Sequence, residues 1–133
     1  MKYLIMVIIL LLMISCSKSF NEKNAQNSDI LNQGQMLYES RCSACHQLGE
    51  NTYGPDHCGL AGRKVGSARE YRYSKAMLSS DIIWDIQILN DFMKSPQSVI
   101  PGNFMSLTGI MDQNTRRLIA YYLIQTSQSS LCS

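Results

Sequence analysis

The stretch Cys42-Ser43-Ala44-Cys45-His46 decides how the rest of this 133-residue chain is interpreted. Two thiols in a Cys-x-x-Cys-His segment lie about one helical turn apart, so each can form a thioether to one vinyl group of a haem, with the histidine beneath the iron. A thioredoxin-like redox pair would need a βαβ setting, and a zinc site would need a second ligand pair at suitable spacing. The segment therefore favours covalent haem attachment, with a haem-free thiol oxidoreductase using Cys42 and Cys45 as an alternative.

The surrounding sequence predicts an all-α domain with long loops. Apolar periodicity and capping residues predict a helix over residues 29–41 after an N-cap at Ser28, a second carrying Trp84 and ending at Ser95-Pro96, and a last helix capped by Asp112. Glycine-rich residues 51–67 predict a long loop. Loops of this length in so small a domain are expected only where a prosthetic group fills the centre.

The N-terminal segment is typical of an export signal. Lys2 is followed by twelve uninterrupted apolar residues, too few to span a bilayer as a helix. Met13-Ile14-Ser15-Cys16 resembles the lipobox of bacterial lipoproteins, in which the cysteine receives a diacylglyceryl group. We expect four parts: a signal peptide over 1–15, a lipidated Cys16 with a flexible polar tether over 16–28, the haem domain over 29–126 and a C-terminal tail over 127–133.

Charge and sulfur content narrow the function further. A formal net charge of +2 is too small for a nucleic-acid-binding protein, so no nucleic-acid partner is expected. Among the methionines, Met105 stands apart because it follows the Pro101-Gly102 turn rather than a helical pattern. Two of the five cysteines, Cys58 and Cys132, remain unassigned. Since the sequence does not place their Cα atoms within bonding distance, free or intermolecular thiols are expected ahead of a disulfide.

Taken together, residues 34–121 resemble the class I cytochromes c of the mitochondrial and bacterial c2 type. The matching pieces are Gly34-x3-Tyr38-x3-Cys42, Gly54-Pro55, residues 59–66 (Gly-Leu-Ala-Gly-Arg-Lys-Val-Gly), residues 71–76, Trp84, Leu89, Phe92, Pro96, residues 101–105 (Pro-Gly-Asn-Phe-Met) and residues 118–121. The resemblance implies three main helices with short helical turns and long loops, wrapped around one haem c.

The resemblance also implies a role for individual residues. Cys42 and Cys45 would hold the haem, His46 would be the proximal iron ligand and Met105 the distal one. The carbonyl of Pro55 would accept the other ring N–H of His46. The remaining positions, where the family donates hydrogen bonds to the haem propionates, are Arg63, Tyr73, Trp84 and Asn103.

The implied function is that of a single-electron carrier rather than an enzyme. The expected carrier is lipid-anchored on the periplasmic side of a bacterial membrane and shuttles electrons between complexes such as a quinol:cytochrome c reductase and a terminal oxidase or peroxidase. An alternative is a haem enzyme or sensor in which Met105 is displaceable, so that peroxide or a gas meets the iron.

Two features depart from the family pattern. His57 stands where the family usually has an apolar residue, and packing or hydrogen bonding is expected of it ahead of iron ligation. The lysines that surround the exposed haem edge in mitochondrial members are mostly missing, with Arg41 retained and Gln97, Ser98, Phe104 and Asp112 at such positions. Docking is therefore expected to depend on apolar contact and on the anchor more than on charge steering.

Overall fold

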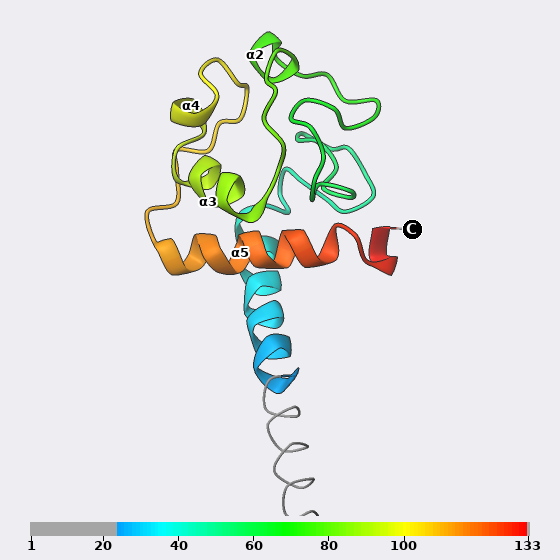
Figure 1. Cartoon of the computed structure of the whole chain (residues 1–133), viewed down its shortest axis with the longest axis vertical. Coiled ribbons are helices and arrows are strands. Elements are labelled where there is room, and N and C mark those ends of the chain that lie inside the picture. Colours follow the sequence, from blue (N-terminus) through cyan, green and yellow to red (C-terminus); the bar gives the residue numbers. More distant parts are fainter. Residues whose placement is uncertain (1–23, 133) are drawn as a thin grey trace, which may run out of the picture. The chain divides into compact units, whose positions relative to one another are not determined.

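The computed structural model describes residues 24–132, so the predicted signal peptide and Cys16 lie outside the described residues. The chain divides into two units, and everything described below belongs to the one that begins at Leu31, apart from the start of the first helix. The elements are a helix over residues 24–41, α2 (Lys75–Leu78), α3 (Ile86–Lys94), α4 (Pro96–Val99), α5 (Gln113–Thr126) and a 3-10 turn η1 (Ser130–Cys132) (Figure 1).

Helices and loops make up the whole of the described segment. The extended pairing found between residues 24 and 132 is one isolated bridge, between Lys64 and Ile83. Within the same range, none of the helices has the length and hydrophobicity needed to cross a bilayer. The prediction of an all-α fold with three main helices, short turns and long loops is confirmed.

The first helix starts earlier than expected. Ser28 does not cap it, because the helix already includes residues 24–27, and the Ser28 hydroxyl donates to the carbonyl of Ala25 (2.8 Å) inside it. No proline or glycine interrupts residues 24–28, and a serine hydroxyl can bond to a carbonyl one turn back without ending a helix. The predicted N-cap at Ser28 is therefore wrong.

The same helix crosses α5 at Gly34. A Cβ placed on this buried glycine would contact the Leu118 carbonyl and lie 2.8 Å from the Cβ of Tyr122. Glycine at this position lets the two backbones approach more closely than any other residue would allow.

The second main helix, α3, begins after Trp84 rather than carrying it. Asp85 is the N-cap, and its carboxylate accepts from the backbone N–H of Ile88 at 2.7 Å. Trp84 therefore lies in the segment that enters the helix, where its buried ring makes an edge contact with Phe92 (centroids 5.1 Å apart). The residue after this helix, Ser95, leads directly into α4 with Pro96 at its first turn.

The third main helix, α5, begins where the sequence predicts. Asp112 accepts from the backbone N–H of Thr115 at 2.6 Å. One turn later, buried Arg116 donates to the carbonyls of Ile110 and Met111, both at 2.7 Å, and to the side chain of Asn90 at 3.2 Å. Arg116 thereby joins α5 to α3 and to the loop between them, a role the sequence analysis did not predict.

Cys58 and Cys132 form a disulfide, with their Cα atoms 5.3 Å apart. The expectation of free or intermolecular thiols is wrong. The end of α5 explains the proximity, because the carbonyl of Ser127 accepts from the backbone N–H of Gly59 at 2.7 Å. This contact brings the C-terminal turn beside the loop that carries Cys58.

Candidate cofactor site

A single cavity collects nearly all the residues that the sequence analysis selected. It has a volume of about 470 Å³, within the range of small-molecule and cofactor sites. Its walls come from the end of the first helix, the loops between that helix and α3, the helices α2 and α3, the loop before α5 and α5 itself. The selected residues that line it are Cys42, Cys45, His46, Pro55, Arg63, Tyr73, Trp84 and Met105.

The two thiols lie in a turn directly after the first helix. The backbone N–H groups of Cys42 and His46 donate to the carbonyls of Tyr38 and Cys42, both at 2.8 Å, so the turn continues the helical geometry. Both thiols are free, and burial raises the pKa of the Cys42 thiol to about 11 although Arg41 opposes the shift. Thiol oxidoreductases need a lowered pKa, so the environment of Cys42 argues against the haem-free alternative.

His46 is buried, and its ring is held by the chain that follows. Its Nδ1 lies 2.9 Å from the carbonyl oxygen of Pro55. Because a carbonyl can only accept, Nδ1 carries the ring proton and Nε2 keeps a free lone pair, the state a metal requires. Burial lowers the pKa of His46, and the Pro55 hydrogen bond opposes that shift only in part, so the ring is neutral.

Met105 lines the same cavity from the loop before α5, and Asn103 fixes that loop. The Asn103 side chain donates to the carbonyls of Pro96 (2.9 Å) and Ile100 (2.7 Å), and its oxygen accepts from the backbone N–H of Met105 at 2.9 Å. Buried Asn103 does not line the cavity, and both N–H groups of its amide are used within the chain. The structure thus gives Asn103 partners other than the propionate that the resemblance implies.

Gln97 is a supporting residue that the sequence analysis treated only as a surface position. Its side chain donates to the carbonyl of Asn103 at 2.9 Å and accepts from the backbone N–H of Gly102 at 3.1 Å. The Pro101-Gly102 turn indicated a fixed loop, but nothing in the sequence showed which side chain would hydrogen-bond to its backbone.

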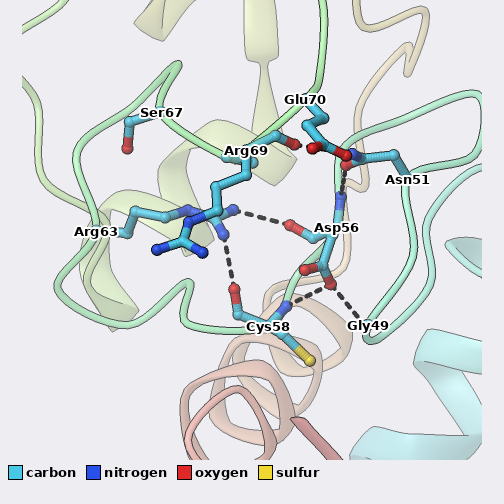
Figure 2. A pocket seen from close by; sticks show the side chains of 9 residues that line it. Gly49, Asn51, Asp56, Cys58, Arg63, Ser67, Arg69 and Glu70 are labelled. Atoms are coloured by element: carbon cyan, nitrogen blue, oxygen red, sulfur yellow. Dashed lines mark hydrogen bonds between the residues drawn. The ribbon is translucent and has the colours of Figure 1, made fainter. Parts of the chain in front are cut away.

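Arg63 brings a positive charge to the edge of the cavity. Its two terminal nitrogens donate to the carbonyls of Cys58 (2.6 Å) and Asp56 (2.8 Å), as Figure 2 shows. Its Nε is buried and has no partner among the described residues. An unsatisfied buried guanidinium N–H is costly, and a carboxylate from a bound group would satisfy it.

Two further propionate candidates line the cavity wall. The hydroxyl oxygen of Tyr73 lies 3.4 Å from the backbone nitrogen of Ala68, which donates to it and leaves the hydroxyl proton available. Burial raises the pKa of Tyr73, so the hydroxyl stays protonated and can act as a donor. Trp84 contributes its buried indole to the same wall.

Together these features fit a haem. The cavity offers two free thiols at one side, a neutral histidine with its Nδ1–H already used, a methionine on a fixed loop and a buried N–H without a partner. Apolar side chains complete the lining: Leu60, Leu89, Phe92, Met93, Ile110 and Leu123. Such a mixture of apolar walls with a few directed polar groups is typical of a cofactor site.

The ring of His57 stacks on that of His46, with centroids 4.3 Å apart and planes inclined by 15°. Its Nδ1 lies 3.2 Å from the hydroxyl oxygen of Tyr38. These contacts agree with the expectation of packing and hydrogen bonding. Tyr38 was selected in the sequence as part of the Gly34-x3-Tyr38-x3-Cys42 pattern, which did not predict its polar contact.

Known proteins share this architecture. The family described as cytochrome c matches residues 31–126. Cytochrome c2 of Agrobacterium tumefaciens is 42% identical over 94 residues, covering 65% of this chain and 85% of the relative. Cytochrome c of Kluyveromyces lactis is 32% identical over 95 residues, covering 69% and 86%.

A solved structure agrees with the sequence relatives. Cytochrome cH from Methylobacterium extorquens superposes with a TM-score of 0.68 at 31% identity, and the match covers 71% of this chain and 97% of that one. The matched range, residues 31–126, includes every residue that lines the cavity. On the strength of sequence, fold and site alike, the chain belongs to the cytochrome c family.

Proposed function

We propose that Cys42 and Cys45 hold the haem of this protein and that His46 and Met105 bind its iron. The family establishes the broader statement, that the chain is an electron carrier with one covalent haem c and not an enzyme. A bound haem supplies an iron that takes up and releases one electron at a time. The observation that carries the assignment is that all four side chains line one cavity, with the His46 Nδ1–H donated to Pro55.

The chain's own residues have distinct tasks in this proposal. The thiols attach the cofactor, Pro55 and Gly54 orient the imidazole, and Asn103 orients the loop of Met105. Arg63 and Tyr73 offer donors that offset the desolvation of carboxylates, while the apolar lining excludes water. In this proposal Arg63 stabilises the negatively charged carboxylates of the cofactor and takes no part in its covalent attachment.

The ligand assignment is tested by Met105→Ala in the holoprotein. We expect the oxidised wild type to show an iron–sulfur charge-transfer band and to bind carbon monoxide slowly when reduced. The variant should lose the band and bind carbon monoxide rapidly, while a covalent-haem stain on a denaturing gel stays positive. A wild type that already binds carbon monoxide rapidly would contradict the closed site and favour the displaceable-methionine alternative.

We further propose that residues 1–15 are a signal peptide, that Cys16 is lipidated and that the protein faces the periplasm of a bacterium. The charged and apolar N-terminal sequence with its lipobox-like end supports this, and the Cys58–Cys132 disulfide is consistent with an oxidising compartment. Intact mass should show the loss of residues 1–15 together with added acyl groups. Cys16→Ser should move the protein from the membrane fraction to the soluble fraction, and an unchanged distribution would contradict the anchor.

The proposed partners are membrane redox complexes, such as a quinol:cytochrome c reductase as donor and a terminal oxidase or peroxidase as acceptor. Two aromatic residues of the cavity wall are strongly exposed, Tyr53 at 87% and Phe104 at 76%. Arg41 and Arg72 are the exposed cations of the same wall. With apolar contact dominant, the rate of electron transfer should change little with ionic strength.

Phe104→Ala tests this mode of docking. We expect a lower second-order rate of electron transfer with a partner complex at both low and high salt, because the loss is one of apolar contact. Met36→Ala is the matched control, since Met36 is 62% exposed and does not line the cavity. A wild-type rate that falls steeply with salt would contradict apolar docking.

A further inference from the structure

His57 touches the proposed proximal ligand without belonging to the set of residues proposed to bind the cofactor. Its imidazole stacks on that of His46 at a centroid distance of 4.3 Å. Its Nδ1 lies 3.2 Å from the hydroxyl oxygen of Tyr38, and that oxygen lies 3.3 Å from the backbone carbonyl of His46. The three residues therefore form a closed group in which His57 contacts His46 directly and, through Tyr38, a second time.

The available protons favour one direction of hydrogen bonding in this group. A neutral His57 that donates from Nδ1 to Tyr38 leaves the tyrosine hydroxyl free to donate to the His46 carbonyl. If the Tyr38 hydroxyl donated to the His57 Nδ1 instead, its proton would no longer be available to the carbonyl of His46. Burial raises the pKa of Tyr38, so the hydroxyl keeps its proton and the two-step chain from His57 to His46 stays intact.

The backbone on both sides of His57 is fixed. The backbone N–H of His57 donates to the carbonyl of Gln47 at 3.1 Å. The Asp56 carboxylate accepts from two backbone N–H groups at 2.7 Å each, and Arg63 donates to the carbonyls of Asp56 and Cys58 (Figure 2). With Cys58 also in the disulfide, the His57 ring is attached to a segment that has little freedom to move.

The His46 ring needs such a neighbour because its other restraints are incomplete. The Pro55 carbonyl fixes one ring nitrogen, but a single hydrogen bond permits the plane to swing about that point. The backbone of Gly54 lies against the ring, where a Cβ would come 2.5 Å from Nδ1 and 2.7 Å from Nε2. The His57 ring, stacked on the His46 ring with the two planes inclined by 15°, restrains the tilt of the His46 ring, which the contacts with Pro55 and Gly54 do not fix.

We propose that His57 and Tyr38 act as a positioning pair that sets the orientation of the His46 imidazole plane. The proposal rests on the proposed function, because it takes His46 as an iron ligand. An aliphatic residue at position 57 could fill the same volume, but it would have neither the flat face nor the bond to Tyr38. The pair thus acts on the cofactor only through His46.

Proton NMR of the oxidised holoprotein tests the pair, since the spread of the four haem methyl shifts depends on the orientation of the axial imidazole plane. We expect both Tyr38→Phe and His57→Leu to change that spread. The double variant should change it no more than the stronger single variant, because the two residues act as one unit. His57→Phe, which keeps a flat ring but loses the hydrogen bond, should restore part of the wild-type pattern.

Tyr122→Phe is the matched control. The Tyr122 ring lies 5.3 Å from that of Tyr38 and is buried in the same cluster, but within the described residues no hydrogen bond or ring contact joins it to His57. Removing its hydroxyl should leave the methyl shifts unchanged.

Several outcomes distinguish positioning from simple packing. Wild-type methyl shifts in both Tyr38→Phe and His57→Leu, with a lowered thermal midpoint, would show packing alone and overturn the proposal. If His57→Leu yields no holoprotein, Tyr38→Phe decides, because it removes one hydroxyl and keeps the ring. A wild type without a low-spin, histidine-ligated spectrum would instead refute the proposed function, so the two failures are distinguishable.

Discussion

The backbone of Gly54 lies directly against the ring of His46. A Cβ at this position would contact the Cε1 atom of the ring and approach both ring nitrogens. The Pro55 carbonyl follows immediately and must reach Nδ1. The backbone can therefore serve as acceptor and as contact surface for the same ring only when residue 54 has no side chain.

Gly54→Ala should displace the ring and lengthen its hydrogen bond to Pro55. We expect the holoprotein to lose about 1–3 kcal/mol of stability from overpacking, measured by denaturant unfolding, and its low-spin absorption spectrum to change. Gly59→Ala is the control: φ is +66°, so a left-handed backbone cost of about 1–2 kcal/mol is expected, but nothing lies within 4 Å of the added Cβ. A Gly59→Ala spectrum that changes as much would contradict the contact with His46.

Individual site residues were predictable to different degrees. Cys42, Cys45, His46 and Met105 belong to short patterns with a chemical meaning, so the sequence alone selects them. The actual partners of Asn103 and the Tyr38–His57 contact were not predictable, because hydrogen bonds between loop segments depend on how those loops close. A side chain's type shows what it can donate, but only the folded backbone determines which acceptor it reaches.

At the scale of elements, the crossing of the first helix and α5 is sensitive to side-chain size. Gly34→Ala would place a methyl group against the Leu118 carbonyl and the Tyr122 side chain. Although alanine gains about 1 kcal/mol in helix propensity, overpacking at a helix crossing costs about 1–3 kcal/mol. We expect a net loss of stability in thermal or denaturant unfolding.

Met36→Ala serves as the control on the same helix, because Met36 is exposed and its truncation should have little effect. Equal stability of Gly34→Ala and the wild type would show that the two helices can move apart at no cost, which the close approach of Leu118 argues against.

The start of α5 gives a pH-dependent prediction. Bonds from the side chain and the backbone of Thr115 hold the pKa of the Asp112 carboxyl below its ordinary value. Because the folded value is the lower one, the stabilisation is present above the unfolded pKa of about 4 and is lost as pH falls through the folded value. Asp112→Asn keeps a capping oxygen but cannot titrate.

The thermal midpoints of the wild type and Asp112→Asn, measured from pH 6 down to pH 2, check this. The wild type should be the more stable protein at pH 6, and the difference should narrow as the carboxyl is protonated. If the difference between the two thermal midpoints stays constant from pH 6 to pH 2, the ionised form of Asp112 adds no stability to the start of α5.

Helix positions were predicted better than helix boundaries. The last helix begins at its predicted cap because Asp112 is followed by an uninterrupted helical pattern. The second begins after Trp84 because Asp85, not the apolar period, determines the first turn. The first includes residues before Ser28 because a serine can lie within a helix as well as cap it. Capping residues define an end only where the chain before them cannot be helical.

At the scale of the whole domain, the disulfide joins the cofactor loop to the C-terminal turn. Cys58 and Cys132 are 74 residues apart in sequence, so the sequence contains no local pattern that connects them. Their pairing depends on the direction in which α5 ends, which packing against α3 and the first helix determines. The overall class I fold, by contrast, was predictable because each of its pieces has a sequence signature, and that prediction is confirmed.

Removing the disulfide should destabilise the holoprotein without releasing the cofactor. For a loop of this length, the unfolded chain gains conformational entropy equivalent to about 4 kcal/mol. The double variant Cys58→Ala/Cys132→Ala should show that loss in denaturant unfolding and keep a positive covalent-haem stain. An unchanged unfolding midpoint would contradict a contribution of the disulfide through the entropy of the unfolded chain.

The fixed loop of Met105 has a consequence for the speed of electron transfer. When an iron centre changes its charge, every neighbouring group that moves in response adds to the reorganisation energy and hence to the barrier. Donor and acceptor bonds of Asn103 hold the backbone of Met105, and the Pro55 carbonyl holds the ring of His46, so both groups have little freedom to move when the charge changes. We therefore expect a small reorganisation energy, so that the approach distance between this protein and its partner limits the rate.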